Sequence, residues 1–329
     1  MAKISSYSGA KVLVTGGAGF IGSNLAVKLA EENAVVTVVD FLHPEYGGNL
    51  FNLDPVKERV TLRVQDLNDF EKTSDAVKNQ DFVFHLASQQ NHVLWQNNPF
   101  EDLQNNVRAT LSLLRALQKT GFKGRLVYGG TRGEYGAQKG AIGESALPKP
   151  LGFHELSKLF AGNACELYSK TFGFEFVWAR MANVYGPRAQ VKANTSNVIN
   201  WFVRLALEGK KIPLYQNGKI KRDLIYVDDC VDALMKIGLS PSAHGNVFNI
   251  GSGTPVSLLE VAEKITGIAV SGGIEFVEAD AYRKKQEVGD VFLDIGKLEG
   301  LTGFKPKTSL GEGLRLTVDY YKKHLKKYV

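Results

Sequence analysis

The sequence predicts an α/β fold with a doubly wound parallel sheet and a smaller, mixed C-terminal lobe. Three observations support this fold class. Apolar, β-branched runs alternate with helical patterns through the first half of the chain, and a glycine-rich turn follows the first run directly. The runs also lack the polar alternation of a half-exposed sheet, which is typical of parallel strands that helices cover on both faces.

Six runs before residue 180 have the composition of buried strands. They cover residues 11–15, 34–40, 60–64, 82–86, 125–128 and 175–179. Helical patterns follow three of these runs, at about 21–31, 99–120 and 153–172. The second helical pattern begins at Pro99 and ends before Gly121, and these residue types favour the start and the end of a helix.

The pattern loosens after residue 180, with a helix at about 198–208 among short strand-like pieces, and becomes regular again between 227 and 266. We therefore expect a second lobe, with the binding cleft at the carboxyl ends of the strands. The expected Rossmann-like domain is residues 1–180 with 224–271, and the expected second lobe is residues 181–223 with 272–329.

Composition excludes several classes of protein. The 44% hydrophobic content is ordinary for a globular chain, and the net charge of +6, from 40 Lys+Arg against 34 Asp+Glu, is weak support for a nucleic-acid partner. No apolar stretch is long enough to span a membrane. Cys165 and Cys230 form neither a disulfide framework nor a metal motif. We expect a cytoplasmic protein with reduced thiols, no metal, and no nucleic-acid or membrane partner.

Residues 15–22, Thr-Gly-Gly-Ala-Gly-Phe-Ile-Gly, join the first strand to the first helix. Glycines at this spacing let the backbone turn tightly and approach a pyrophosphate, whose charge then lies at the helix N-terminus. The pattern therefore predicts a dinucleotide site. The turn residues expected to contact the cofactor are Gly16, Gly19, Phe20, Ile21 and Gly22.

An acidic residue, Asp40, ends the second strand. There it is placed to bind both hydroxyls of an adenosine ribose, and its charge would repel a 2′-phosphate. The sequence therefore predicts NAD rather than NADP. Asp66 and Leu67, which follow the third strand, are placed at the edge of the adenine.

Further motifs are spread over the chain. They are HLAS at 85–88, Asn106-Val107, Thr131 ahead of Tyr135-Gly136, Lys158, NVYGPR at 183–188, Arg222-Asp223, YVDD at 226–229 and NIGSG at 249–253. On the basis of these motifs and the glycine turn, the chain resembles the extended short-chain dehydrogenase/reductase superfamily, and within it the NAD-dependent epimerase/dehydratase enzymes that act on nucleotide sugars. The resemblance covers nearly the whole chain. The resemblance implies NAD as the cofactor, with Leu86 and Ala87 beside it, and a nucleotide-diphosphate sugar as the substrate.

The resemblance also implies three catalytic positions: a Ser or Thr that hydrogen-bonds the reacting oxygen, a Tyr base, and a Lys four residues later that holds the nicotinamide ribose. Thr131 and Lys158 match, but His154 stands where the Tyr is expected. His154 and Lys158 share one face of their helix, while the apolar residues Phe153, Leu156, Phe160 and Leu167 lie on another side.

A neutral imidazole accepts a proton, and a nearby ammonium keeps it neutral, so His154 is a candidate base. Imidazole is shorter than a phenol, and misplacement of a base is costly in rate. Three alternatives therefore stay open: the sugar sits deeper, a water bridges the gap, or another group is the base. His92, in the loop after the fourth strand, is the second candidate base. A further alternative is a catalytically idle histidine, packed or solvated.

A second departure narrows the reaction. The 4,6-dehydratases of the family carry an Asp-Glu pair after the catalytic Thr, whereas this chain has Arg132 and Gly133, with Glu134 displaced by one residue. Glycine transfers no proton, so dehydration is disfavoured. The remaining chemistry is expected at one sugar carbon, C4.

Resemblance implies a substrate site formed by Asn183, Arg188, Arg222 and Arg283, of which the arginines suit a diphosphate. The usual Arg-Pro-Gly-Asp-like segment is altered here to Gln-Glu-Val-Gly-Asp at 286–290. The helices at 99–120 and 153–172 resemble those that form a dimer interface in the family, which implies a homodimer.

Together these features predict an NAD-dependent nucleotide-sugar epimerase or 4-oxidoreductase. A 4-ketoreductase is the alternative enzyme. A non-catalytic protein that binds NAD or a sugar nucleotide is the alternative from another class, although a pure binder would not need Thr131, Lys158 and Asn183 together.

Overall fold

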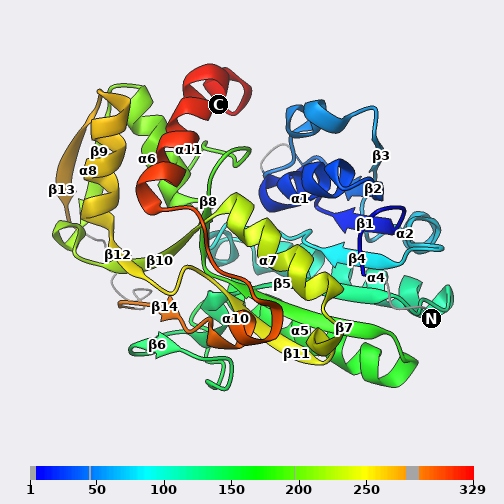
Figure 1. Cartoon of the computed structure of the whole chain (residues 1–329). Helices are drawn as coiled ribbons and strands as arrows, with labels where there is room; N and C mark the ends of the chain where they lie inside the picture. Colours follow the sequence, from blue (N-terminus) through cyan, green and yellow to red (C-terminus); the bar gives the residue numbers. More distant parts are fainter. Residues whose placement is uncertain (1–4, 44–45, 196, 279–288) are drawn as a thin grey trace.

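The computed structural model describes residues 5–43, 46–195, 197–278 and 289–329 (Figure 1). Within them, a seven-stranded parallel sheet has the order β11-β7-β5-β4-β1-β2-β3. Its strands are β1 (Lys11–Thr15), β2 (Val35–Asp40), β3 (Val60–Val64), β4 (Phe82–His85), β5 (Arg125–Thr131), β7 (Glu175–Met181) and β11 (Asn246–Ile250). The predicted doubly wound α/β sheet is confirmed, and each of the six predicted runs is one of its strands.

Helices cover both faces of this sheet (Figure 1). Alternate residues of β1 divide between two apolar cores, because successive side chains of a strand point to opposite faces. Val12 and Val14 pack in one core with α1 (Phe20–Glu31) and α7 (Val227–Leu239). Leu13 packs in the other, with α2 (Phe70–Val77), α4 (Ala109–Lys119) and α5 (Phe153–Phe172). The short α2 has no counterpart among the predicted helices, since eight residues give little periodicity.

The strand order reverses between β1 and β4. From β1 the chain runs outward to β2 and β3, then crosses back to place β4 on the other side of β1. Thr15, the last residue of β1, is in register with His85 of β4. A doubly wound sheet opens a crevice at this point, beyond the carboxyl ends of its strands, and the functional site lies there.

The prediction of one continuous helix at 99–120 is wrong. The segment consists of α3 (Pro99–Asp102), a π-helical turn, η3 (Leu103–Arg108), and then α4. The π-helical turn contains one residue more per turn than an α-helix, so it changes which side chains face the neighbouring helix α5.

A second lobe contains short sheets that pair segments far apart in the sequence (Figure 1). They are β8 (Asn183–Tyr185) with β10 (Lys221–Tyr226) and β12 (Pro255–Ser257), β9 (Lys211–Tyr215) with β13 (Gly273–Val277), and β6 (Ala141–Ile142) with β14 (Phe292–Leu293). Among the described residues, helices α6 (Val198–Leu207), α8 (Leu258–Ala269) and α11 (Leu310–His324) pack on one another in this lobe, and α10 (Gly296–Thr302) contacts β11 and α7.

Within the predicted return segment 224–271, α7 and β11 join the central sheet, but α8 packs against α6 and α11 of the lobe. The domain boundaries stay a prediction. No helix in the described part of the chain has the length and apolar character that a membrane span requires.

Candidate active site

A cavity of about 700 Å³ opens at the carboxyl edge of the sheet and continues into the second lobe. Its size is that of a site for a cofactor or a small molecule. Every residue predicted to contact the cofactor lines it. These residues are Gly16, Gly19, Phe20, Ile21, Gly22, Asp40, Asp66, Leu67, Leu86, Ala87 and Lys158.

Glycine is required in the turn between β1 and α1. Gly16 has a φ of +67°, and a Cβ there would lie 2.8 Å from the Cα of Ala87. A Cβ on Gly22 would collide with the carbonyl oxygen of Gly16. The turn is therefore tight enough for a pyrophosphate to reach the first backbone N–H groups of α1.

Asn52, from the short helix η1 (Leu50–Val56), supports this turn from outside. Its side-chain amide donates to the carbonyl oxygen of Ala18 at 2.9 Å, and its own oxygen accepts a hydrogen bond from the Tyr328 hydroxyl at 2.6 Å. Tyr328 thus contacts the glycine turn through one intervening side chain.

Asp40 lies at the end of β2, with its carboxylate held by the backbone. Its two oxygens accept hydrogen bonds from the N–H groups of Ala18 and Leu42, at 2.9 and 2.8 Å. Burial raises the pKa of Asp40, and these backbone groups limit the rise. The glycine cradle and a carboxylate at this strand end fit a dinucleotide whose adenosine ribose has free hydroxyls.

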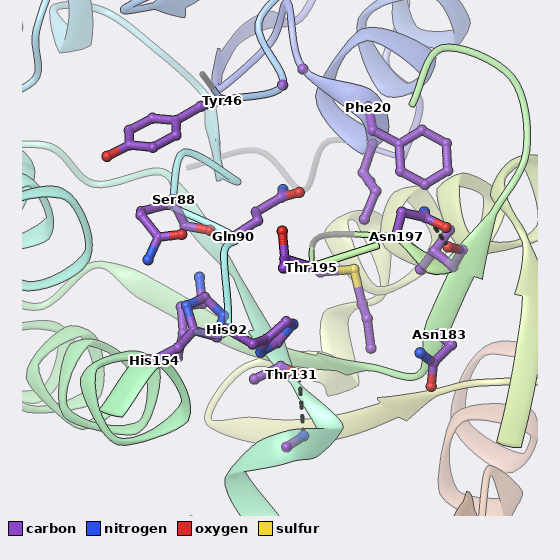
Figure 2. Close-up of a pocket in the computed structure, with 18 of the residues that line it drawn as sticks. Phe20, Tyr46, Ser88, Gln90, His92, Thr131, His154, Asn183, Thr195 and Asn197 are labelled. Carbon is purple, nitrogen blue, oxygen red and sulfur yellow. Dashed lines mark hydrogen bonds between the residues drawn. The ribbon is translucent and has the colours of Figure 1, made fainter. Parts of the chain in front are cut away.

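His154 is the second residue of α5 and faces the cavity (Figure 2). It is only 4% exposed. Burial lowers the pKa of its imidazole, and the neighbouring Asp102 carboxylate offsets only part of this effect. His154 is therefore neutral at pH 7 and is able to accept a proton.

The ring of His92 lies edge-on to that of His154, with 4.6 Å between the ring centroids and 77° between the planes (Figure 2). Nδ1 of His92 is 2.8 Å from Oε1 of Glu155. Burial of Glu155 disfavours its charge, but the hydrogen bond to His92 and the adjacent imidazoles lower its pKa to about 2. His92 is therefore tied to a carboxylate at the mouth of the cavity, whereas His154 lies deeper.

Lys158 follows His154 by one helical turn and is also buried. Its Nζ lies 4.6 Å from the centre of the Tyr128 ring. Burial lowers the pKa of Lys158 to about 8, against the opposing influence of the Glu134 charge. The ammonium form predominates at pH 7, and it lines the same cavity as His154.

Thr131 ends β5 and also lines the cavity (Figure 2). Its hydroxyl oxygen accepts the N–H of Gly133 at 3.2 Å, so the side chain is fixed as a helix cap. Glu134 is used elsewhere: its fully buried carboxylate accepts the N–H of Thr131 at 2.9 Å and the Nε–H of Arg180 at 2.6 Å. It is not among the residues that line the cavity, and both of its oxygens are hydrogen-bonded inside the protein.

Only some of the predicted substrate residues line the cavity. Asn183 and Arg222 line the cavity, and Asn183 accepts a hydrogen bond from Nε of Arg132 at 2.8 Å. Arg188 does not line it, because its guanidinium hydrogen-bonds to Asn24 of α1. Arg283 and residues 286–288 of the altered segment lie outside the described residues.

Several lining residues were not predicted. Tyr46, Trp201 and Tyr215 lie on loops or in the second lobe, where no motif marks them. Asp102, behind His154, was also missed, although its spacing of four residues from Asn106 places both on one side of a helix. No cluster of three or more metal-binding side chains is present in the described ranges.

Comparisons with known proteins agree with this architecture. The family model described as NAD dependent epimerase/dehydratase family matches residues 12–251. A putative UDP-glucose 4-epimerase of Methanocaldococcus jannaschii is 31% identical over 315 residues, covering 94% of this chain and 98% of the relative.

Two solved structures are similar over almost their whole length. The UDP-glucose 4-epimerase of Thermotoga maritima with UDP-glucose is 30% identical, with a TM-score of 0.87 and coverage of 96% of this chain and 99% of the other. The UDP-glucuronic acid 4-epimerase of Bacillus cereus, in complex with UDP-glucuronic acid and NAD, is 27% identical, with a TM-score of 0.84 and coverage of 95% and 99%.

Proposed function

This chain belongs to the NAD-dependent epimerase/dehydratase family, and we propose that it is a nucleotide-sugar 4-epimerase or 4-oxidoreductase in which His154 is the base. NAD is the cofactor. The observation that carries the proposal is a neutral, buried His154 one helical turn before a cationic Lys158, with both side chains lining the cavity that the glycine turn opens.

Bound NAD supplies the acceptor for a hydride from the sugar carbon. The chain's own residues move the proton. The neutral imidazole of His154 takes the proton of the sugar hydroxyl as the carbon loses its hydride, which leaves a carbonyl and an imidazolium. The Thr131 hydroxyl hydrogen-bonds the reacting oxygen, and the Lys158 ammonium binds the ribose hydroxyls and disfavours a standing charge on His154.

Return of the hydride to the opposite face of the carbonyl carbon, with the His154 imidazolium giving its proton back to the carbonyl oxygen, would give an epimer. Release of the keto-sugar instead would give net oxidation. The relatives named above are epimerases, which supports the first outcome. The occupied carboxylate of Glu134 and the glycine at 133 support neither dehydration nor a second acid at this site.

The substrate we propose is a UDP-sugar, since the two similar structures contain UDP-glucose and UDP-glucuronic acid. Arg222 and Asn183 line the part of the cavity in the second lobe, where a diphosphate and a sugar would lie. Arg188 and Arg283 stay predicted substrate contacts. Buried free thiols at Cys165 and Cys230 support a reducing, cytoplasmic location.

The test compares His154→Phe, His92→Gln and, as a control outside the cavity, His244→Gln. Product formation and absorbance at the reduced-nicotinamide band are measured with UDP-glucose and UDP-glucuronic acid. We expect His154→Phe to lower kcat by about 10²–10⁴-fold, as loss of a general base does. His244→Gln should leave kcat unchanged.

Each result assigns a role. A product without a lasting absorbance rise means an epimerase, and a lasting rise means an oxidoreductase. Unchanged turnover in His154→Phe with loss in His92→Gln would move the base to His92. Binding of NAD without turnover of either sugar would favour a ketoreductase or a non-catalytic binder.

We also propose a homodimer. Large apolar side chains on α3, η3 and α5 are exposed: Phe100 (73%), Leu103 (40%), Leu156 (49%), Phe160 (51%) and Leu167 (63%). We name these five residues the apolar stripe. Helices that turn such residues outward while burying polar ones mark a protein–protein interface.

A further inference from the structure

We propose that Asp102 is a positioning residue for His154: its buried carboxylate keeps the imidazole proton on Nδ1 and leaves Nε2 free to face the substrate. The proposal rests on His154 as the base, and it adds a residue outside the motifs named in the sequence analysis above. Asp102 ends α3 and is fully buried. Its Oδ1 lies 3.4 Å from Nδ1 of His154.

The hydrogen bonds of Asn106 indicate whether His154 Nδ1 accepts a proton from Asn106 or donates one to Asp102. The side-chain oxygen of Asn106 accepts the backbone N–H of Gln89 at 2.9 Å, which fixes the orientation of the amide. Its two N–H groups donate to Asp102 Oδ1 and Ser157 Oγ, both at 2.9 Å. Since an amide has only two such protons, none is left for His154 Nδ1, which lies 3.5 Å from the same nitrogen. Nδ1 therefore has no N–H donor of Asn106 left to accept, and a proton on Nδ1 is the state that pairs with the Asp102 carboxylate 3.4 Å away.

The Asp102 carboxylate is able to accept one more hydrogen bond, from an N–H at His154 Nδ1. Its Oδ1 accepts from Asn106 and, at 3.1 Å, from Nε2 of Gln89. Its Oδ2 is buried and has no hydrogen-bond partner among the described residues. An unpaired buried oxygen is costly, and an N–H at His154 Nδ1, which lies 3.4 Å from the other oxygen of this carboxylate, is the donor that we propose for it.

The requirement follows from the replacement of a phenol by an imidazole. A phenol has a single oxygen, but a neutral imidazole has two nitrogens, and only the unprotonated one is a base. A carboxylate at Nδ1 selects the tautomer and stabilises the imidazolium after proton transfer. The other charged or titratable groups around His154 are His92, Glu155 and Lys158, and none of them hydrogen-bonds to its Nδ1 in the described structure.

The π-helical turn begins directly after Asp102 and contains Asn106. Such turns are rare and frequent at functional sites. Here the turn packs on α5, and Asn106 of the turn joins Asp102 to Ser157 of α5. Ser157 in turn donates to the carbonyl oxygen of His154 at 2.7 Å, so both the ring and the backbone of His154 are held from this segment.

Two substitutions separate the orientation of the ring from the charge beside it. Asp102→Asn keeps an acceptor oxygen but removes the charge. Asp102→Ala removes the acceptor and frees an Asn106 N–H to donate to His154 Nδ1, which would place the imidazole proton on Nε2. Asp229→Ala is the control, because Asp229 is also buried but accepts backbone N–H groups of Lys307 and Thr308, away from the cavity.

The first readout needs no turnover: the ring ¹⁵N chemical shifts of His154 in histidine-labelled protein report the tautomer. We expect the proton on Nδ1 in the unmodified chain and in Asp102→Asn, and on Nε2 in Asp102→Ala. The second readout is kcat and KM for UDP-glucose. We expect Asp102→Ala to lower kcat by about 10²-fold with little change in KM, as misdirection of a catalytic group does.

In Asp102→Asn we expect a smaller loss of kcat and an acidic limb of the kcat/KM profile at lower pH. Melting temperatures of all variants measure any structural contribution. An unchanged tautomer in Asp102→Ala, or a loss that only matches the loss of stability in Asp229→Ala, overturns the proposal. If His154→Phe retains turnover, the proposed base fails, and the tautomer in Asp102→Ala still decides whether Asp102 positions the ring.

Discussion

An imidazole in place of a phenol sets the pH range in which the site can work. His154 must be neutral to accept a proton, and burial lowers its pKa below the ordinary value, so activity should be lost only as the pH falls through that lowered pKa. Lys158 must be protonated to act as a cation, so activity should also be lost as the pH rises through about 8. We expect a bell-shaped kcat/KM profile with these two limbs.

The profile is measured with UDP-glucose in overlapping buffers from acid to alkaline pH. His154→Tyr provides the comparison, because a tyrosine would lose the acidic limb that the imidazole produces. An acidic limb that persists unchanged in His154→Tyr would contradict the assignment of that limb to His154.

We expect the buried Lys158 ammonium to increase kcat but to lower the free energy of unfolding. Its folded pKa of about 8 is below the ordinary 10.5, so the unfolded chain binds this proton more tightly, and stability should rise with pH between the two values. Lys158→Met should therefore raise the melting temperature at pH 7 by roughly 2–4 °C, while kcat falls by about 10²-fold or more.

Thermal unfolding followed by circular dichroism checks this expectation. Lys170→Met is the control, because Lys170 is an exposed lysine of the same helix paired with Glu166. A melting temperature that falls in Lys158→Met would show that the Tyr128 ring and Glu134 outweigh the burial of the ammonium.

Sequence reasoning named the residues that we propose as the reacting ones, but not the residue that we propose orients His154. Thr131, Lys158 and His154 were found because each lies at a fixed place in a motif. Asp102 was not found, since a carboxylate in a helix has no sequence feature that reveals a buried imidazole beside it. Arg188 stays a predicted substrate contact, although in this structure its guanidinium donates a hydrogen bond to Asn24 of α1.

At the scale of elements, helix α5 packs against the central sheet and carries both His154 and Lys158. His154, Lys158 and Gly162 follow one another at four-residue intervals and face inward, while Leu156, Phe160 and Leu167 face outward. A Cβ on Gly162 would collide with the Trp178 ring of β7. The glycine therefore fixes how closely α5 approaches the sheet, and with it the depth of His154 and Lys158.

Gly162→Ala should push α5 away from β7, because the indole is fully packed. We expect a loss of about 1–3 kcal/mol in the free energy of unfolding and a fall in kcat of up to 10²-fold. Gly267→Ala in α8 is the matched control, since a Cβ there meets nothing within 4 Å. Urea unfolding and kcat measure both effects, and equal stability of the two variants would refute the role of Gly162.

The elements of the central sheet could be predicted because each carries its own periodicity. The π-helical turn at 103–108 could not, because one extra residue in a turn leaves the apolar pattern nearly unchanged. The pairing of β6 with β14, and of β9 with β13, depends on contacts between distant segments and short strands, which no local pattern encodes.

For the whole molecule, the apolar stripe predicts a dimer that charge should disrupt. Phe160→Glu combined with Leu167→Glu should convert the dimer to a monomer, because two carboxylates would be buried without partners. Light scattering after size exclusion gives the mass directly. Phe276→Glu is the control, since Phe276 is equally exposed but lies on β13 in the second lobe (Figure 1). A monomeric unmodified chain would contradict the proposed dimer.

The contact of Tyr328 with Asn52 has a consequence for synthesis of the protein. A ribosome adds Tyr328 276 residues after Asn52, at about 5–20 residues per second. The glycine turn therefore lacks the support of that hydroxyl until Tyr328 has been synthesised. Nascent chains released before Tyr328 are expected to form the sheet yet bind the dinucleotide weakly, and a fluorescence titration of Tyr328→Phe with NADH would measure the difference.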